Sequence, residues 1–287
     1  MQSLVQSLQS NQVLLMDGAM GTELQRAGIG DGECYEAWNL TQPEKIRTIH
    51  QSYVDAGAEV LLSNTFQANP PGLARFYQDE NLTPIIRAGL AHARAALPRS
   101  GWVLADIGPL STVELKAVWP ILNACHDADG LLLETFSDPA EVDVFVRANR
   151  SGLGPKKPVL ASFTFDGATL RTFQDATPEK CARAAANMGV SALGVNCGRN
   201  LALSACVEIL RRYRAITDLP LFARPNAGNP TTFTQPHEYT QTPEEMAAEL
   251  PLLFEAGAVM VGGCCGTMPQ HIRAFRSVVD AWNVRKG

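Results

Sequence analysis

Apolar residues along the chain fall into short continuous runs rather than into alternating in-out patterns. Runs of this kind indicate strands with both faces buried, as in a parallel sheet. They predict eight strands, at residues 13–17, 59–64, 102–107, 130–134, 158–163, 192–197, 220–224 and 259–263.

Between these runs, apolar residues recur at helical spacing, and several of the segments open with Thr-Pro or Asp-Pro. Helices are predicted at residues 43–56, 83–96, 139–150, 178–188, 201–216, 243–256 and 269–282. Strands that alternate with helices indicate a parallel sheet, and eight such units favour a closed barrel. We therefore predict an α/β fold, a (β/α)8 TIM barrel that forms a single domain over residues 1–287.

The segment between the third and fourth strands fits this pattern least well. Residues 111–129 leave room for only a short helix, so a doubly wound open sheet is the alternative fold. No Gly/Ser linker, charge run or low-complexity tract marks a domain boundary. One domain is therefore the simpler interpretation.

Composition and charge narrow the function mainly by exclusion. The net charge is −5 and no basic block occurs, so the electrostatic footprint of a nucleic-acid-binding protein is missing. No apolar run approaches the ~20 residues of a membrane span, and the first twelve residues show neither the basic start nor the apolar core of a signal sequence. Seven cysteines, an odd number, indicate reduced thiols. We expect a cytoplasmic protein without nucleic-acid or membrane partners.

Three of the cysteines stand at the ends of two predicted strands. Cys197 closes one strand, and Cys264 and Cys265 follow another. Because the carboxyl ends of parallel strands meet at one end of a barrel, the three sulfurs are expected to converge. Three thiolates without a fourth protein ligand suit Zn²⁺ with one open coordination position. From spacing alone, two other interpretations are together about as good as a metal site: cysteines that act as buried small apolar residues, and a Gly-rich phosphate-binding loop.

Polar residues at the strand ends add acids, amides and an arginine to the same rim, namely Asp17, Asn64, Asp106, Glu134, Asn196 and Arg224. Each has a structural alternative. Asp17 could start a turn, Glu134 could form a buried ion pair, and the two asparagines could satisfy loop backbone groups. Asp106 and Arg224 could pair with their neighbours. The histidines show no metal-binding or nucleophile spacing and are interpreted as core or surface residues.

Five motifs resemble those of the homocysteine S-methyltransferases, a family that includes the barrel modules of cobalamin-dependent methionine synthase and betaine–homocysteine methyltransferase. They are DGAMGTEL at 17–24, SNTF at 63–66, LET at 133–135, GVNC at 194–197 and VGGCCGT at 261–267. The resemblance covers most of the chain. Its C-terminal third is most similar to the methionine synthase branch.

This resemblance implies a zinc-dependent enzyme that moves a methyl group to the thiolate of homocysteine and so takes part in methionine biosynthesis. It implies that the three cysteines hold the catalytic zinc and that Asp17 and Glu134 receive the substrate ammonium group. The backbone of Gly18, Ala19 and Met20 would meet the substrate carboxylate. Asn64 and Asn196 are added as substrate-binding candidates at the same rim. A free alkyl thiol has a pKa of about 8.5, and coordination to a metal removes its proton.

The methyl donor is left open by the sequence. The chain ends after the barrel, and we expect either an S-methylmethionine-type sulfonium or a methyl corrinoid delivered by a separate protein. Betaine ranks lower, because only Phe66 and Phe163 are aromatic candidates for the rim. Two other functions remain as alternatives. They are a barrel enzyme acting on a phosphorylated metabolite and a non-catalytic barrel that binds zinc or a corrinoid protein.

Overall fold

Eight parallel strands form the centre of the molecule. The computed structural model describes residues 2–10, 12–98, 100–110, 114–151, 156–232 and 234–286. The strands are β1 (Leu14–Leu15), β2 (Val60–Leu62), β3 (Trp102–Ile107), β4 (Gly130–Phe136), β5 (Val159–Phe163), β6 (Ala192–Asn196), β7 (Leu221–Arg224) and β8 (Ala258–Val261). Their order in the sheet is β1-β8-β7-β6-β5-β4-β3-β2, and a parallel bridge between Met16 and Val60 brings the two edge strands together. The predicted (β/α)8 barrel is confirmed, and the open-sheet alternative is wrong.

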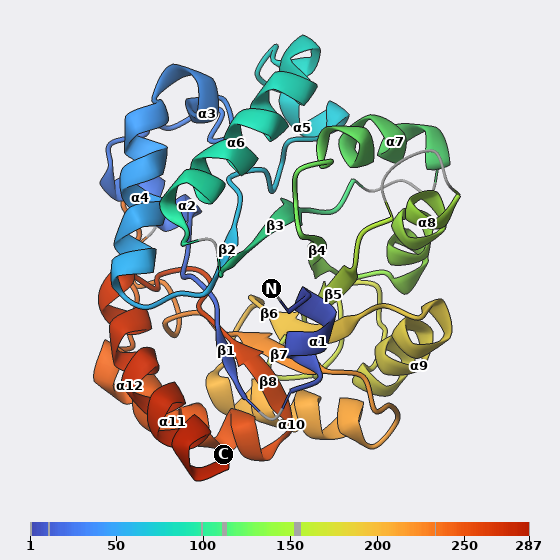
Figure 1. The fold of residues 1–287 in the computed structure, drawn as a ribbon, viewed down its shortest axis with the longest axis vertical. Helices are drawn as coiled ribbons and strands as arrows, with labels where there is room; N and C mark the ends of the chain where they lie inside the picture. The colour runs from blue at the N-terminus through green and yellow to red at the C-terminus, as the bar shows by residue number, and fades with distance from the viewer. Residues whose placement is uncertain are drawn as a thin grey trace.

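Helices surround the barrel on its outside (Figure 1). They are α2 (Gly21–Arg26), α3 (Trp38–Thr41), α4 (Pro43–Asp55), α5 (Pro70–Ala74), α6 (Leu82–Ala96), α7 (Leu115–Ala124), α8 (Pro139–Arg150), α9 (Pro178–Met188), α10 (Leu203–Arg214), α11 (Pro243–Glu255) and α12 (Pro269–Lys286), with a short 3₁₀ helix at Asp79–Asn81. The predicted start signals work as N-caps, since the side chains of Asp138, Thr177 and Thr242 accept backbone N–H groups of the first turn. No helix of the described residues is long and apolar enough to cross a membrane.

The segment that fitted the pattern least well contains α7, which packs against α6 and α8. A short helix thus suffices to connect β3 to β4. Residues 111–113, at the start of this segment, lie outside the described residues.

The interior of the barrel is filled by apolar side chains. Members of this cluster come from each of the eight strands or the residue that follows: Leu14, Met16, Val60, Leu62, Leu104, Leu132, Leu160, Ala192, Phe222 and Met260. A short helix that the sequence pattern did not predict, α1 (Leu4–Leu8), adds Leu4 and Leu8 to it. In Figure 1, α1 lies over the middle of the barrel. It closes the end at which the strands begin.

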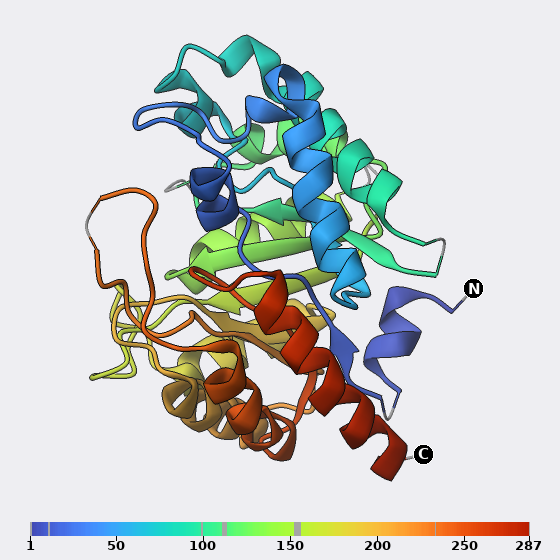
Figure 2. The ribbon, with the colours of Figure 1, turned by 90° about the vertical axis from the view of Figure 1, so that its left-hand side faces the viewer.

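The two ends of the barrel therefore differ. Both termini lie at the end covered by α1, whereas long loops extend from the opposite end (Figure 2). The most prominent is a hairpin arm between β7 and α11, formed by residues 229–232 and 234–240. A bridge from Pro230 to Tyr239 pairs its two sides. The arm reaches back over the rim, where Gln235 donates from Nε2 to the hydroxyl of Tyr35 at 3.1 Å.

Candidate metal and substrate site

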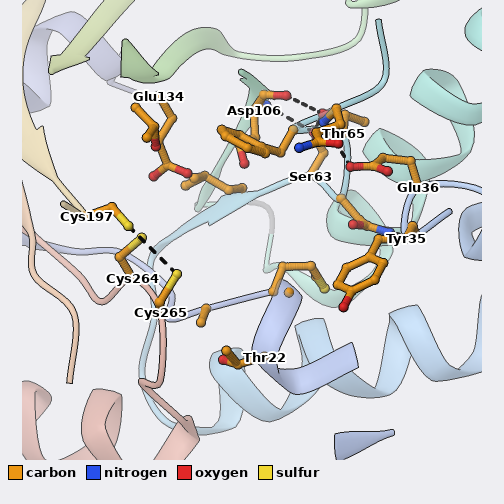
Figure 3. A pocket seen from close by; sticks show the side chains of 18 of the residues that line it. Thr22, Tyr35, Glu36, Ser63, Thr65, Asp106, Glu134, Cys197, Cys264 and Cys265 are labelled. Carbon is orange, nitrogen blue, oxygen red and sulfur yellow. Dashed lines mark hydrogen bonds between the residues drawn. The ribbon is translucent and has the colours of Figure 1, made fainter. Parts of the chain in front are cut away.

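Three sulfur atoms meet at the carboxyl ends of β6 and β8. The Sγ atoms of Cys197, Cys264 and Cys265 all lie within 4.8 Å of one another, and those of Cys197 and Cys265 are 3.9 Å apart (Figure 3). Within the described parts of the chain, this is the one cluster of His, Cys, Asp or Glu side chains close enough to share a metal ion. The other cysteines are buried free thiols.

The backbone around the sulfurs is tightly constrained. Cys197 has a φ of 51°, a left-handed conformation that is uncommon for a residue with a side chain. A Cβ atom on Gly263 would come within 2.2 Å of Thr267 Oγ1, so only glycine fits between β8 and the cysteines. Thr267 in turn donates from Oγ1 to the carbonyl oxygen of Cys264 at 2.7 Å. The loop therefore holds its two cysteines in fixed places.

The same loop cannot serve as a phosphate cradle through its glycines. The N–H of Gly262 donates to Ala223 O at 3.1 Å, and the N–H of Gly263 donates to Asp17 O at 3.0 Å. The N–H of Cys264 donates to Pro225 O at 2.8 Å. A phosphate would need these donors free. The phosphate-binding interpretation of the glycines is therefore not supported.

The three thiols are unequal in acidity. Hydrogen bonds from Cys264 and Cys265 lower the pKa of Cys197 well below that of a free cysteine. The bond with Cys197 raises the pKa of Cys264 to about 12, and bonds with both neighbours raise that of Cys265. One thiolate is thus stabilised by two thiols when no cation is present. Ionising all three requires a positive charge between them, and soft thiolate ligands fit Zn²⁺.

Asp17 and Glu134, the acids predicted to bind the substrate ammonium group, are joined by Arg224. Its guanidinium donates to Glu134 Oε1 and, at 3.2 Å, to Asp17 Oδ1. Burial raises the pKa of each acid to about 7, although Arg224 opposes the shift. The ion pair that was the structural alternative for Glu134 is present. Both acids nevertheless line the cavity described below.

Asp106 is a third buried acid at this rim. Its Oδ1 atom has no hydrogen-bond partner within the described residues, and no salt bridge there joins it to Arg224. Burial, followed by the charge of Glu134, raises its pKa well above the usual range. One guanidinium is thus paired with two carboxyl groups, and the carboxyl group of Asp106 adds a third to the same rim. This charge balance favours a further cation in the cavity.

A cavity of about 550 Å³ opens above the sulfurs and the acids. All three cysteines line it, and so do most of the predicted substrate-binding residues: Asp17, Gly18, Ala19, Met20, Asn64 and Glu134. Gly18 is required at its position, because a Cβ atom there would lie 2.7 Å from the ring of Tyr53. Asn196 is fully buried behind the wall and does not line the cavity.

Aromatic side chains also contribute to the wall. Phe66 lines the cavity as predicted, whereas Phe163 is buried in the core and does not. Tyr35 and Phe76 line it too, together with the buried carboxyl of Glu36. Tyr35 and Glu36 lie across the cavity from the cysteines (Figure 3). No sequence motif pointed to Tyr35, Glu36 or Phe76, because these three residues come from loops outside the strand ends.

Several known proteins are similar to this chain in sequence. The model of the homocysteine S-methyltransferase family matches residues 14–279. The chain is 31% identical to the methionine synthase of Mycobacterium tuberculosis, over 94% of this chain and 25% of that protein. It thus spans about a quarter of that relative's length. It is 29% identical to the homocysteine S-methyltransferase of Escherichia coli, over 94% of this chain and 96% of that protein.

A solved structure agrees with the sequence comparisons. The metallated form of the homocysteine methyltransferase MmuM from Escherichia coli superposes with a TM-score of 0.78 at 28% identity. The match covers 94% of this chain and 97% of that chain.

Proposed function

Because the chain belongs to the homocysteine S-methyltransferase family, we propose that it uses Zn²⁺ bound by Cys197, Cys264 and Cys265 to methylate homocysteine with a small cationic donor. The observation that carries this proposal is the triangle of sulfurs beside a cavity with an excess of buried carboxyl groups. The metallated form of the similar Escherichia coli enzyme supports a metal at such a site.

Zinc, when bound, would lower the pKa of the homocysteine thiol and so keep its sulfur nucleophilic at neutral pH. The residues of the chain bind and orient the rest of the substrate. The ammonium group would pair with Asp17 and Glu134, with Asp106 as a third acceptor. The N–H of Ala19 donates to Thr267 Oγ1, so the substrate carboxylate is expected at the neighbouring Gly18 and Met20.

The lining of the cavity also suits a donor that carries a positive charge. Tyr35, Phe66 and Phe76 present aromatic rings, which attract sulfonium and quaternary ammonium groups. Arg75, also in the wall, offers a partner for a carboxylate. We therefore propose an S-methylmethionine-type sulfonium as the donor. The ranking of betaine below it rested on a lack of aromatic residues at the rim, and these three rings weaken that argument.

A methyl corrinoid on a separate protein is the second candidate donor. Its support is the similarity to the mycobacterial methionine synthase, of which this chain spans about a quarter. Such a donor does not need aromatic residues in the cavity. The two candidate donors can be distinguished by supplying each in a separate reaction.

The test supplies the zinc-loaded protein with homocysteine and, in separate reactions, with S-methylmethionine, betaine and methylcobalamin, and follows methionine formation. We expect turnover with S-methylmethionine and its loss in the Cys264→Ser, Cys265→Ser double variant. The control is Cys125→Ala, which removes a buried thiol after α7, far along the chain from the cluster. Absence of methionine with every donor, or full activity in the double variant, would refute the proposal.

A further inference from the structure

Asn196 is the last residue of β6 and makes four side-chain hydrogen bonds. Its Oδ1 atom accepts the backbone N–H of Thr135 at 3.1 Å and the hydroxyl of Ser162 at 2.6 Å. Its Nδ2 atom donates to Thr135 Oγ1 at 2.8 Å and to Cys264 Sγ at 3.8 Å. A side-chain amide has two N–H donors and two acceptor lone pairs, so its capacity is fully used.

The orientation of this amide follows from its partners. A backbone N–H can only donate, so the atom that faces the N–H of Thr135 has to be the oxygen. The NH2 group is then the part of the side chain that faces Cys264. The contact with the sulfur is therefore an N–H···S hydrogen bond.

Thr135 has an unusual backbone conformation. Its φ is 64°, in the left-handed region that β-branched residues rarely adopt. The pairing of β4 with β5 also shifts between Leu133 and Phe136. Strained conformations persist only when the surroundings hold them, and Asn196 bonds both the N–H and the hydroxyl of Thr135. The residue just before it is Glu134, whose direction into the cavity depends on this backbone.

We propose that Asn196 is a positioning residue that ties the metal-binding sulfur of Cys264 to the ammonium-binding carboxyl of Glu134. One amide bonds the sulfur of Cys264 and both polar groups of Thr135, the residue after Glu134, so a change at either side reaches the other through a single rigid side chain. This inference rests on the proposed function, since it takes Cys264 as a metal ligand and Glu134 as a substrate contact. It replaces direct substrate contact as the role of Asn196.

The N–H···S bond has a chemical consequence as well. A hydrogen bond to a thiolate stabilises its negative charge, and groups that hydrogen-bond to metal ligands tune the affinity of the metal. Three protein thiolates and the thiolate of homocysteine would together bring four negative charges to a +2 ion. Asn196 offsets part of this excess at Cys264.

Asn196→Asp tests the inference with little change in size. The variant keeps an acceptor for Thr135 N–H and for Ser162 but loses the N–H donors toward Cys264 and Thr135 Oγ1. Zn²⁺ affinity, measured by competition with a chromophoric chelator in the absence of homocysteine, should fall about 10-fold or more. With Co²⁺ as a probe, the sulfur-to-metal absorption band should shift. The Kd for homocysteine, measured on zinc-loaded protein, should rise.

Ser162→Ala is the matched control. It removes one hydrogen bond to the same amide and leaves both N–H donors in place, so Zn²⁺ affinity should stay within about twofold of wild type. If Asn196→Asp does not fold, Thr135→Val removes the hydroxyl that accepts from Asn196 while keeping the shape of the side chain. It should raise the Kd for homocysteine severalfold.

Two results would overturn the inference. One is a folded Asn196→Asp protein with Zn²⁺ and homocysteine affinities both within twofold of wild type. The other, where that variant does not fold, is an unchanged homocysteine affinity in Thr135→Val. Failure of the proposed function would look different, because wild-type protein would then bind no homocysteine. The Zn²⁺ comparison, made without homocysteine, would still decide the role of Asn196.

Discussion

Arg224 donates to Asp17 Oδ1 across 3.2 Å, and both side chains are only 3% exposed. The same guanidinium also binds Glu134. Burial nevertheless raises the pKa of both acids to about 7, so one guanidinium does not fully compensate two buried carboxylates. On the proposed function, the ammonium group of homocysteine would supply the missing positive charge.

Asp17→Asn and Glu134→Gln should therefore weaken homocysteine binding and leave the metal content unchanged. Each variant removes a charge-assisted hydrogen bond, with an expected loss of about 1.5–3 kcal/mol in binding free energy. Calorimetry gives the affinity, and elemental analysis gives the metal content. Asp127→Asn, at an exposed acid that does not line the cavity, is the control. Unchanged affinity in both cavity variants would return these acids to a purely structural ion pair.

Homocysteine binding should release more than one proton per site near pH 6.5. The thiol loses one proton on binding the metal. Asp17 and Glu134 add a further fraction, because a neighbouring ammonium lowers carboxyl pKa values that lie at about 7 in the free protein. The number of protons released beyond the first should fall above pH 8, where both acids are already ionised. It should also fall in the Glu134→Gln variant. Calorimetry in buffers of different ionisation enthalpy counts the protons. A count near zero would show that the sulfur is not bound to a metal.

His50 should make the protein less stable in mild acid. Both ring nitrogens lack partners within the described residues, and burial, helped by His92, lowers the pKa to about 3. The unfolded chain therefore binds a proton near pH 6.5 and the folded protein does not. The stability that depends on a neutral His50 is fully present above pH 6.5 and is lost progressively as the pH falls from there toward 3. Thermal unfolding of wild type and His50→Leu should diverge over this range. Parallel pH curves would contradict the assignment.

Leu4→Ala and Leu8→Ala should each destabilise the protein by about 2–5 kcal/mol, because both leucines are buried against the barrel interior. Metal content and methionine formation at temperatures well below the unfolding transition should not change. Gln9→Ala, at an exposed position next to α1, is the control. Denaturant unfolding measures the difference. A loss of activity without a loss of stability would mean that α1 acts on the site itself.

The sequence predicted the barrel and the cysteine cluster because both depend on local signals. Apolar runs mark buried strands, and a cysteine at the end of a parallel strand lies at the rim wherever the neighbouring strands lie. The end of β8 was less predictable. It stops at Val261, since Gly262 and Gly263 leave the strand but still donate to Ala223 and Asp17.

Other parts of the site depend on contacts between distant segments. Arg224 meets Asp17 across 207 positions of the chain, so the strand-end pattern showed both residues but not their pairing. Tyr35 and Phe76 enter the cavity from loops with no periodic signal. The helix α1 is too short to show an amphipathic pattern, and its two leucines acquire their role only when the barrel closes over them.

The packed barrel interior also bears on the order of events during turnover. Side chains fill the space below the sulfurs from β1 to β8, and α1 covers the far end, so both reactants enter from the rim. On the proposed function, the acceptor would have to reach the sulfurs at the strand ends, whereas Tyr35, one of the aromatic residues proposed to bind the donor, lies across the cavity from them (Figure 3). A donor already in place would stand in the path of the acceptor. We therefore expect compulsory-order kinetics, in which homocysteine binds first and the methionine formed from it is the last product to dissociate.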